Sequence, residues 1–148
     1  MPQDRMTAED RLDIFDLFAR YAWAYDCGDA DAYAAVFTED GLLADQGDLH
    51  AVGHAAIREA IKTFFNMRGA HAWQHHNDHL RIEGDGRTCT VHSYWLLAEH
   101  NQDDGQHHLR AMGWYVTRCR KVDGRWLIAE RTFHFETPQG LPPGLKSH

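Results

Sequence analysis

The stretch RLDIFDLFARYAWAYD at residues 11–26 has the pattern of an amphipathic helix that ends in an acid. Its apolar residues recur at steps of three and four, which places them on one face of an α-helix; they are Ile14, Leu17, Phe18, Tyr21 and Tyr25. Asp26 follows beside these aromatic residues, although the helix dipole disfavours a negative charge at a C-terminus. Asp26 therefore either opens the turn at residues 26–29 or has a functional role, and taken alone it favours the turn.

Length and charge restrict the class of protein. A chain of 148 residues is long enough for one core and too short for two, so we expect a single domain. The formal charge of −7, with only 15 Lys and Arg, argues against a nucleic-acid partner. There is no signal-peptide pattern and no apolar run of about 20 residues, and the three Cys form no Cys-x-x-Cys pair. We therefore expect a cytoplasmic protein that has reduced thiols and does not bind membranes.

Helices are predicted in the first part of the chain and strands in the second. The helices are expected at residues 11–26, 30–37 and 53–68, with a small hairpin at residues 42–52 before the third. From residue 71 the apolar period changes to two, which predicts an antiparallel meander. Its strands are expected at residues 71–82, 88–100, 109–121 and 126–136, the last two joined by a tight turn at Asp123 and Gly124.

This order predicts an α+β fold in which three N-terminal helices pack in a strongly curved antiparallel sheet, as in a cone. We expect one domain over residues 1–148, with its core at residues 7–136 and a Pro-containing tail at residues 137–148. Asp26 would face a pocket at the open end of the cone. Because the strands carry apolar residues on both faces, the face without helices is expected to form a homodimer or homotrimer.

Four histidines crowd the first meander strand, and three roles compete for them. They are His71, His75, His76 and His79. Some will be surface residues, and a metal site is disfavoured because strand neighbours point to opposite faces. The third role is a general base, because a histidine ring held by Asp26 can remove a proton and be stabilised as imidazolium. Such proton transfer requires no cofactor, and the sequence has no phosphate loop or nucleophile triad.

Several motifs together resemble the SnoaL-like branch of the nuclear transport factor 2 superfamily. They are Tyr25-Asp26-x-x-Asp29, Gly53-x-x-x-Ile57, His75 ahead of Arg81, and Val122-Asp123-Gly124-x-Trp126. The resemblance runs from about residue 7 to residue 136, and at these motif positions the chain resembles scytalone dehydratase and lindane dehydrochlorinase. It implies a cone fold and a catalytic dyad formed by Asp26 and His75.

The resemblance implies three further functional residues. Tyr25 and His100 match residues of scytalone dehydratase, and Arg131 matches an Arg of the dehydrochlorinase. Arg131 also lies on the apolar face of its strand, and a buried Arg needs an anionic partner. Asp26 is one acid that could supply it.

The resemblance also has gaps. Scytalone dehydratase holds its substrate with a Tyr, a Ser and an Asn at positions where this chain has Asp45, Gly113 and Tyr115. The substrate of that enzyme therefore cannot be assigned to this chain. Tyr21 stands where the dehydrochlorinase has a Lys, so stabilisation of the leaving group must differ. Strict alternation from Ile82 would also turn His76 rather than His75 toward the core, unless a bulge intervenes near residues 77–78.

We therefore predict a cofactor-independent lyase or isomerase, similar to a dehydratase, that acts on a small apolar cyclic substrate. His75 would remove a proton, Asp26 would orient His75, and Tyr25 or Arg131 would support the developing charge. The residues expected to contact substrate are Tyr21, Trp73, Trp95, His100 and Phe133. The alternatives are a polyketide cyclase-like enzyme and a non-catalytic ligand-binding or docking module, such as the small subunit of a dioxygenase.

Overall fold

The computed structural model describes residues 5–136, and over this range three helices pack against one sheet. The helices are α1 (Ala8–Asp26), α2 (Ala30–Ala35) and α3 (Gly53–Met67). The strands are β1 (Phe37–Ala44), β2 (His50–Val52), β3 (Ala72–Gly84), β4 (Thr88–His100), β5 (His107–Val122) and β6 (Arg125–Phe135). The predicted tail at residues 137–148 lies outside the described residues.

Helix α1 begins at a capping box and buries the face predicted from the sequence. The Asp10 backbone N–H donates to Thr7 Oγ1 at 3.0 Å, and the Thr7 N–H donates to Asp10 Oδ2 at 2.9 Å. These bonds satisfy N–H groups that have no partner within the helix. Ile14, Leu17 and Phe18 are buried against the sheet, so the end of α1 is held in a fixed position.

Asp10 also ties α1 to the far end of the chain. Lys121 Nζ lies 2.6 Å and Trp126 Nε1 lies 2.9 Å from Asp10 Oδ1. Burial acts to raise the pKa of Asp10, but the hydrogen bonds from Lys121, Thr7 and Trp126 outweigh it and hold this pKa well below the usual range. Asp10 therefore stays ionised in the first turn of α1.

Substituting Asp10→Ala is expected to lower the free energy of unfolding by about 2–4 kcal/mol, because it leaves the Lys121 charge without its buried partner. Asp16→Ala is the matched control, since Asp16 pairs with Arg20 in an exposed contact and should cost at most about 1 kcal/mol. Urea unfolding measures both. Because the pKa of Asp10 is lower in the folded state, the wild-type advantage should shrink as the pH falls through that pKa. Equal losses for the two variants would contradict this account.

The six strands form one sheet in the order β2-β1-β6-β5-β4-β3. The meander of β3 to β6 is antiparallel as predicted, and the β5–β6 turn has positive φ angles at Asp123 and Gly124, as a tight hairpin requires. The prediction that the second helix reaches Phe37 is wrong. Phe37 instead begins β1, and β1 pairs in parallel with β6. The Ile128 N–H also donates to Val36 O, just before β1 begins.

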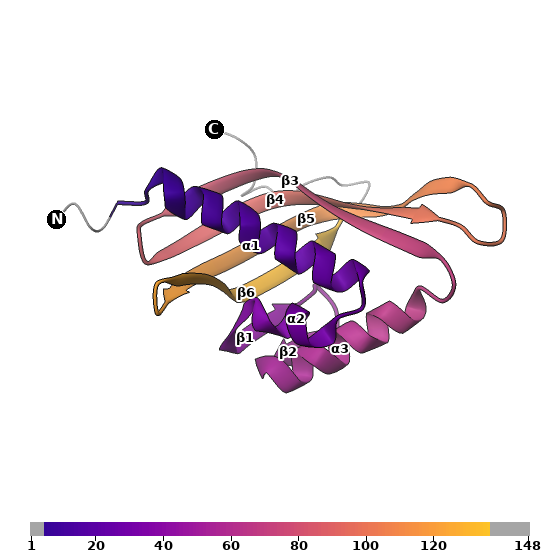
Figure 1. Ribbon diagram of the computed structural model, residues 1–148, viewed down its shortest axis with the longest axis horizontal. Helices are drawn as coiled ribbons and strands as arrows, with labels where there is room; N and C mark the ends of the chain where they lie inside the picture. The colour runs from indigo at the N-terminus through magenta and orange to yellow at the C-terminus, as the bar shows by residue number, and fades with distance from the viewer. Residues whose placement is uncertain (1–4, 137–148) are drawn as a thin grey trace.

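The helices lie on one face of the curved sheet, and the β4–β5 hairpin extends beyond them (Figure 1). This arrangement confirms the predicted α+β cone. The opposite face carries apolar side chains that are about half exposed, among them Tyr94, Leu96 and Met112. Assembly through that face stays a prediction. Over residues 5–136, none of the helices combines the length and apolar character that a membrane span requires.

Candidate active site

A bulge in β3 determines which histidine faces the helices. The pairing of β3 with β4 shifts register between Asp78 and Arg81, and His79 within the shift has a φ of 55°. The extra residue reverses the alternation, so that Ile82 and His75 both point inward. His76 points outward, where its Nε2 lies 2.9 Å from the Gln74 side chain. A bulge close to residues 77–78, which the sequence analysis required for His75 to face inward, is therefore present.

Asp26 and His75 meet where the end of α1 reaches β3. His75 Nδ1 lies 2.6 Å from Asp26 Oδ1, and the His75 backbone N–H donates to Asp26 Oδ2 at 2.9 Å. The side chain of Asp26 is only 16% exposed and that of His75 only 7%. Both carboxylate oxygens of Asp26 therefore bind the same residue, which fixes the position of the strand as well as of the ring.

This contact determines the tautomer of His75. An ionised carboxylate can only accept hydrogen bonds, so Nδ1 carries the proton that lies between His75 and Asp26. In the neutral ring, Nε2 then has a free lone pair. His75 contributes to the cavity wall, so the arrangement can accept a proton from a bound molecule and stabilise the resulting imidazolium.

Tyr25 packs on the His75 ring and restricts its rotation. The two ring centroids are 4.0 Å apart. Burial, together with the nearby Tyr21 and Asp26, raises the pKa of Tyr25 well above its ordinary value. Its hydroxyl group therefore remains a proton donor at neutral pH and does not act as a base.

The dyad opens into a cavity of about 480 Å³, a size that suits a small organic molecule. Of the predicted substrate-contacting residues, Tyr21, Trp73, Trp95 and Phe133 line it. Asp45 and Tyr115, which stand where scytalone dehydratase holds its substrate, also line it. The sequence did not identify several other wall residues, among them Tyr33, Phe64, Leu97 and Arg110. Periodicity marks such residues as apolar or inward-facing, but it does not separate cavity wall from core.

Arg131 is buried, as the apolar face of its strand predicts, but within residues 5–136 it lies beside aromatic rings and not beside a carboxylate. It is fully buried, but it lies behind the cavity wall and does not pair with Asp26. Its Nε donates to Thr117 Oγ1 at 2.9 Å, while its guanidinium carbon lies 4.2 Å from the ring centroids of three aromatic residues. These are Phe18, Tyr21 and Tyr115. Aromatic faces attract a cation, so they take the place of the carboxylate that was predicted.

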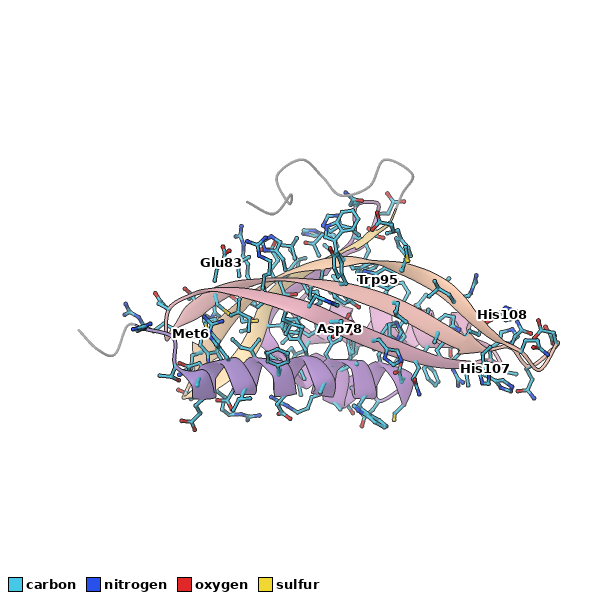
Figure 2. The ribbon with its side chains drawn as sticks, turned by 90° about the horizontal axis from the view of Figure 1, so that it is seen from above. Met6, Asp78, Glu83, Trp95, His107 and His108 are labelled. Atoms are coloured by element: carbon cyan, nitrogen blue, oxygen red, sulfur yellow. The ribbon has the colours of Figure 1, made fainter. Side chains whose placement is uncertain are left out.

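His100 lies at the end of β4, near the turn of the β4–β5 hairpin. It ends β4 and pairs with His107, their rings 5.0 Å apart. Figure 2 shows His107 and His108 at the far end of the extended β4–β5 hairpin. His100 is not among the described residues that line the cavity, and its contact with substrate stays a prediction. Within residues 5–136, no three His, Cys, Asp or Glu side chains are grouped as metal ligands.

Residues 6–132 match the family described as the SnoaL-like domain. The chain is 25% identical to a variant of Rv3472, a protein of unknown function from Mycobacterium tuberculosis, with 93% of this chain and 80% of that chain covered and a TM-score of 0.79. No curated protein matches the chain.

Two further solved structures have a similar fold. An NTF2-like protein with a cystatin-like fold from Novosphingobium aromaticivorans is 26% identical, with 86% of this chain and 82% of that chain covered and a TM-score of 0.79. A protein from Catenulispora acidiphila, solved in complex with S-DNPA, is 24% identical, with 87% of this chain and 95% of that chain covered and a TM-score of 0.78. These similarities agree with the helix and sheet arrangement described above.

Proposed function

Since this chain belongs to the SnoaL-like domain family, we propose that it is a cofactor-independent lyase or isomerase of small cyclic, apolar compounds. His75 is the general base and Asp26 orients it. The observation that carries this proposal is the 2.6 Å contact between His75 Nδ1 and Asp26 Oδ1 beside the cavity. A docking module has no need for a buried acid that holds a histidine in one tautomer.

The reaction begins with removal of a proton from a carbon atom of the substrate. Nε2 of His75 takes this proton, and the positive charge of the imidazolium is stabilised by the Asp26 carboxylate. Because the dyad is largely buried, this interaction is stronger than it would be in water. The electron pair left on the substrate then forms an enolate or expels a leaving group.

The cavity wall supports the proposed substrate class. Trp73, Trp95, Phe64 and Phe133 supply flat apolar surfaces that suit a ring. The Catenulispora acidiphila protein of similar fold was solved in complex with S-DNPA, which supports a ligand-binding role for this chain. Cyclisation of a polyketide could use the same base and the same walls, so it remains the alternative within this proposal.

The proposal can be tested before the natural substrate is known. Purified protein is incubated in D₂O with a panel of cyclic ketones and cyclic β-hydroxy ketones, and exchange of the acidic C–H is followed by NMR. We expect the wild-type protein to accelerate exchange or loss of water for at least one member, and His75→Gln to remove that acceleration. Equal exchange by the two proteins would contradict the assignment of His75 as the base.

A further inference from the structure

The face of the sheet that is turned away from the helices carries a second hollow. Within residues 5–136, no helix covers this face (Figure 1). Strand pairing aligns two rows of side chains across it, which are Asp78, Tyr94, Trp114 and His134 in one row and His76, Leu96, Met112 and Glu136 in the next. Six of them, all except Trp114 and His134, line a hollow of about 530 Å³. We call this hollow the outer groove.

Two ring nitrogens in the first of these rows are buried without a partner. Trp114 and His134 stack on each other with their ring centroids 5.0 Å apart, and Trp114 is only 4% exposed. Among the described residues, neither Trp114 Nε1 nor His134 Nδ1 has a hydrogen-bond partner. An indole N–H can only donate, and a buried donor without an acceptor costs free energy. The row therefore lacks an acceptor for Trp114.

The outer groove combines exposed apolar side chains with two acids. Tyr94, Leu96 and Met112 are about half exposed, so they leave a continuous apolar surface in water. Asp78 lies on β3 and Glu136 directly follows β6, at opposite sides of the groove, and neither carboxylate has an ion-pair partner in the part of the chain that the structure describes. A segment that fits the groove is therefore apolar, carries a positive charge and offers a hydrogen-bond acceptor.

The sequence TPQGLPPGLKSH at residues 137–148 has these three properties and begins at the side of the groove. It follows Glu136, whose backbone N–H donates to Met112 O at 2.9 Å. Two leucines and three prolines supply apolar groups, and Lys146 supplies the positive charge. Consecutive prolines favour the polyproline conformation, in which backbone carbonyls make no internal hydrogen bonds and can accept one from an aromatic-lined groove.

This segment is also long enough to cross the groove. The distance from β6 to β3 across the sheet is about 14 Å, at about 4.8 Å between neighbouring strands. The chain from Glu136 to Leu141 spans about 15 Å when it is extended, so the residues from Leu141 onward can reach each of the four strands. Attachment beside the groove gives the segment an effective concentration of the order of millimolar. A second copy binding around a twofold axis has no such advantage and brings two further acids to the same surface.

We propose that residues 141–146 of the same chain bind in the outer groove. The leucines and prolines of this segment cover the exposed apolar side chains, a backbone carbonyl accepts from Trp114 Nε1, and Lys146 pairs with Asp78 or Glu136. Trp95 lines both the outer groove and the cavity, so the bound segment supports the cavity wall from behind. It also competes for the groove with the assembly that the sequence predicts through this face.

A spin label near the end of this segment tests the proposal on the full chain, because it weakens the NMR signals of nearby protons. The label is attached to Ser147→Cys in a Cys27→Ser background, since Cys89 and Cys119 are buried. The amide signals of Tyr94, Leu96 and Met112 should lose most of their intensity. A mixture of isotope-labelled protein without the spin label and spin-labelled protein without the isotope should show no such loss, which distinguishes the segment of the same chain from that of a second copy.

Hydrogen exchange of the Trp114 indole N–H gives a second measurement. Leu141→Ser together with Leu145→Ser should speed this exchange about tenfold or more, because the loss of one buried Leu contact has an effect of this size. Leu109→Ser is the matched control and should leave the rate unchanged, since Leu109 is 62% exposed and does not line the groove. His75→Gln should change neither measurement, because the proposal does not depend on the proposed function.

Melting temperatures show whether each variant is folded, and the spin-label result decides if the double variant is not. Three results would overturn the proposal. They are groove signals that keep their intensity, a loss of intensity that also appears in the mixture, and an exchange rate of the Trp114 indole that a folded double variant leaves unchanged.

Discussion

Replacing His75 by glutamine is expected to lower kcat/KM by about 10²- to 10⁴-fold, the usual contribution of a positioned general base. Glutamine fills a similar space and can still donate to Asp26, so the cavity should keep its shape. Its amide has no lone pair that accepts a proton near neutral pH. The loss should therefore fall on kcat, while KM changes little. Steady-state kinetics on a substrate found by the exchange screen measures both constants.

His76→Gln is the matched control for this substitution. His76 is the next residue in β3, it faces away from the cavity, and its Nε2 contacts Gln74. The same change there should leave kcat/KM within about twofold of wild type, because surface substitutions have small effects. Equal losses at His75 and His76 would indicate a general effect on β3, and loss at His76 alone would mean that the bulge does not place the histidines as described.

The helical part of the site could be predicted from the sequence because its signals are local. The apolar spacing of α1 places Tyr21, Tyr25 and Asp26 near one another on adjoining stripes. Gly and Asp then mark the end of the helix and the turn after it. The structure agrees closely here, since packing and local preference favour the same arrangement.

The histidine register could not be derived from local signals. Alternation is exact along a regular strand, so a single extra residue reverses every side chain beyond it. The bulge at residues 78–81 is specified by the way β3 pairs with β4, a contact between distant parts of the chain. Only the resemblance to known enzymes favoured His75, and the structure provides the physical reason.

The environment of Arg131 was missed for a different reason. A rule based on charge predicts a carboxylate beside a buried Arg, and the sequence offers Asp26 as one. Aromatic residues that satisfy a cation come from α1 and β5, and nothing in the sequence links Phe18 with Tyr115. Their meeting depends on how α1 crosses the sheet, which is a property of tertiary packing.

Substituting Asp26→Asn should lower kcat/KM by about 10²- to 10⁴-fold, because it changes the tautomer of His75. Asp26 now accepts two hydrogen bonds, one from the His75 backbone N–H and one from Nδ1. An asparagine has one oxygen and one NH₂ group. The backbone N–H can only donate, so the asparagine oxygen must face it and the NH₂ group must face Nδ1. Nδ1 then becomes an acceptor, and the ring proton moves to Nε2, the atom required to act as base.

The ¹⁵N chemical shifts of His75 report this change independently of activity, and they should show Nε2 protonated in Asp26→Asn and Nδ1 protonated in wild type. Asp29→Asn is the matched control in the same turn. Asp29 caps α2 by accepting from the Ala32 N–H at 2.9 Å, and asparagine caps a helix equally well, so activity and tautomer should not change. If Asp26→Asn keeps kcat/KM within about threefold of wild type while the tautomer changes, the free lone pair on Nε2 is not what drives the reaction.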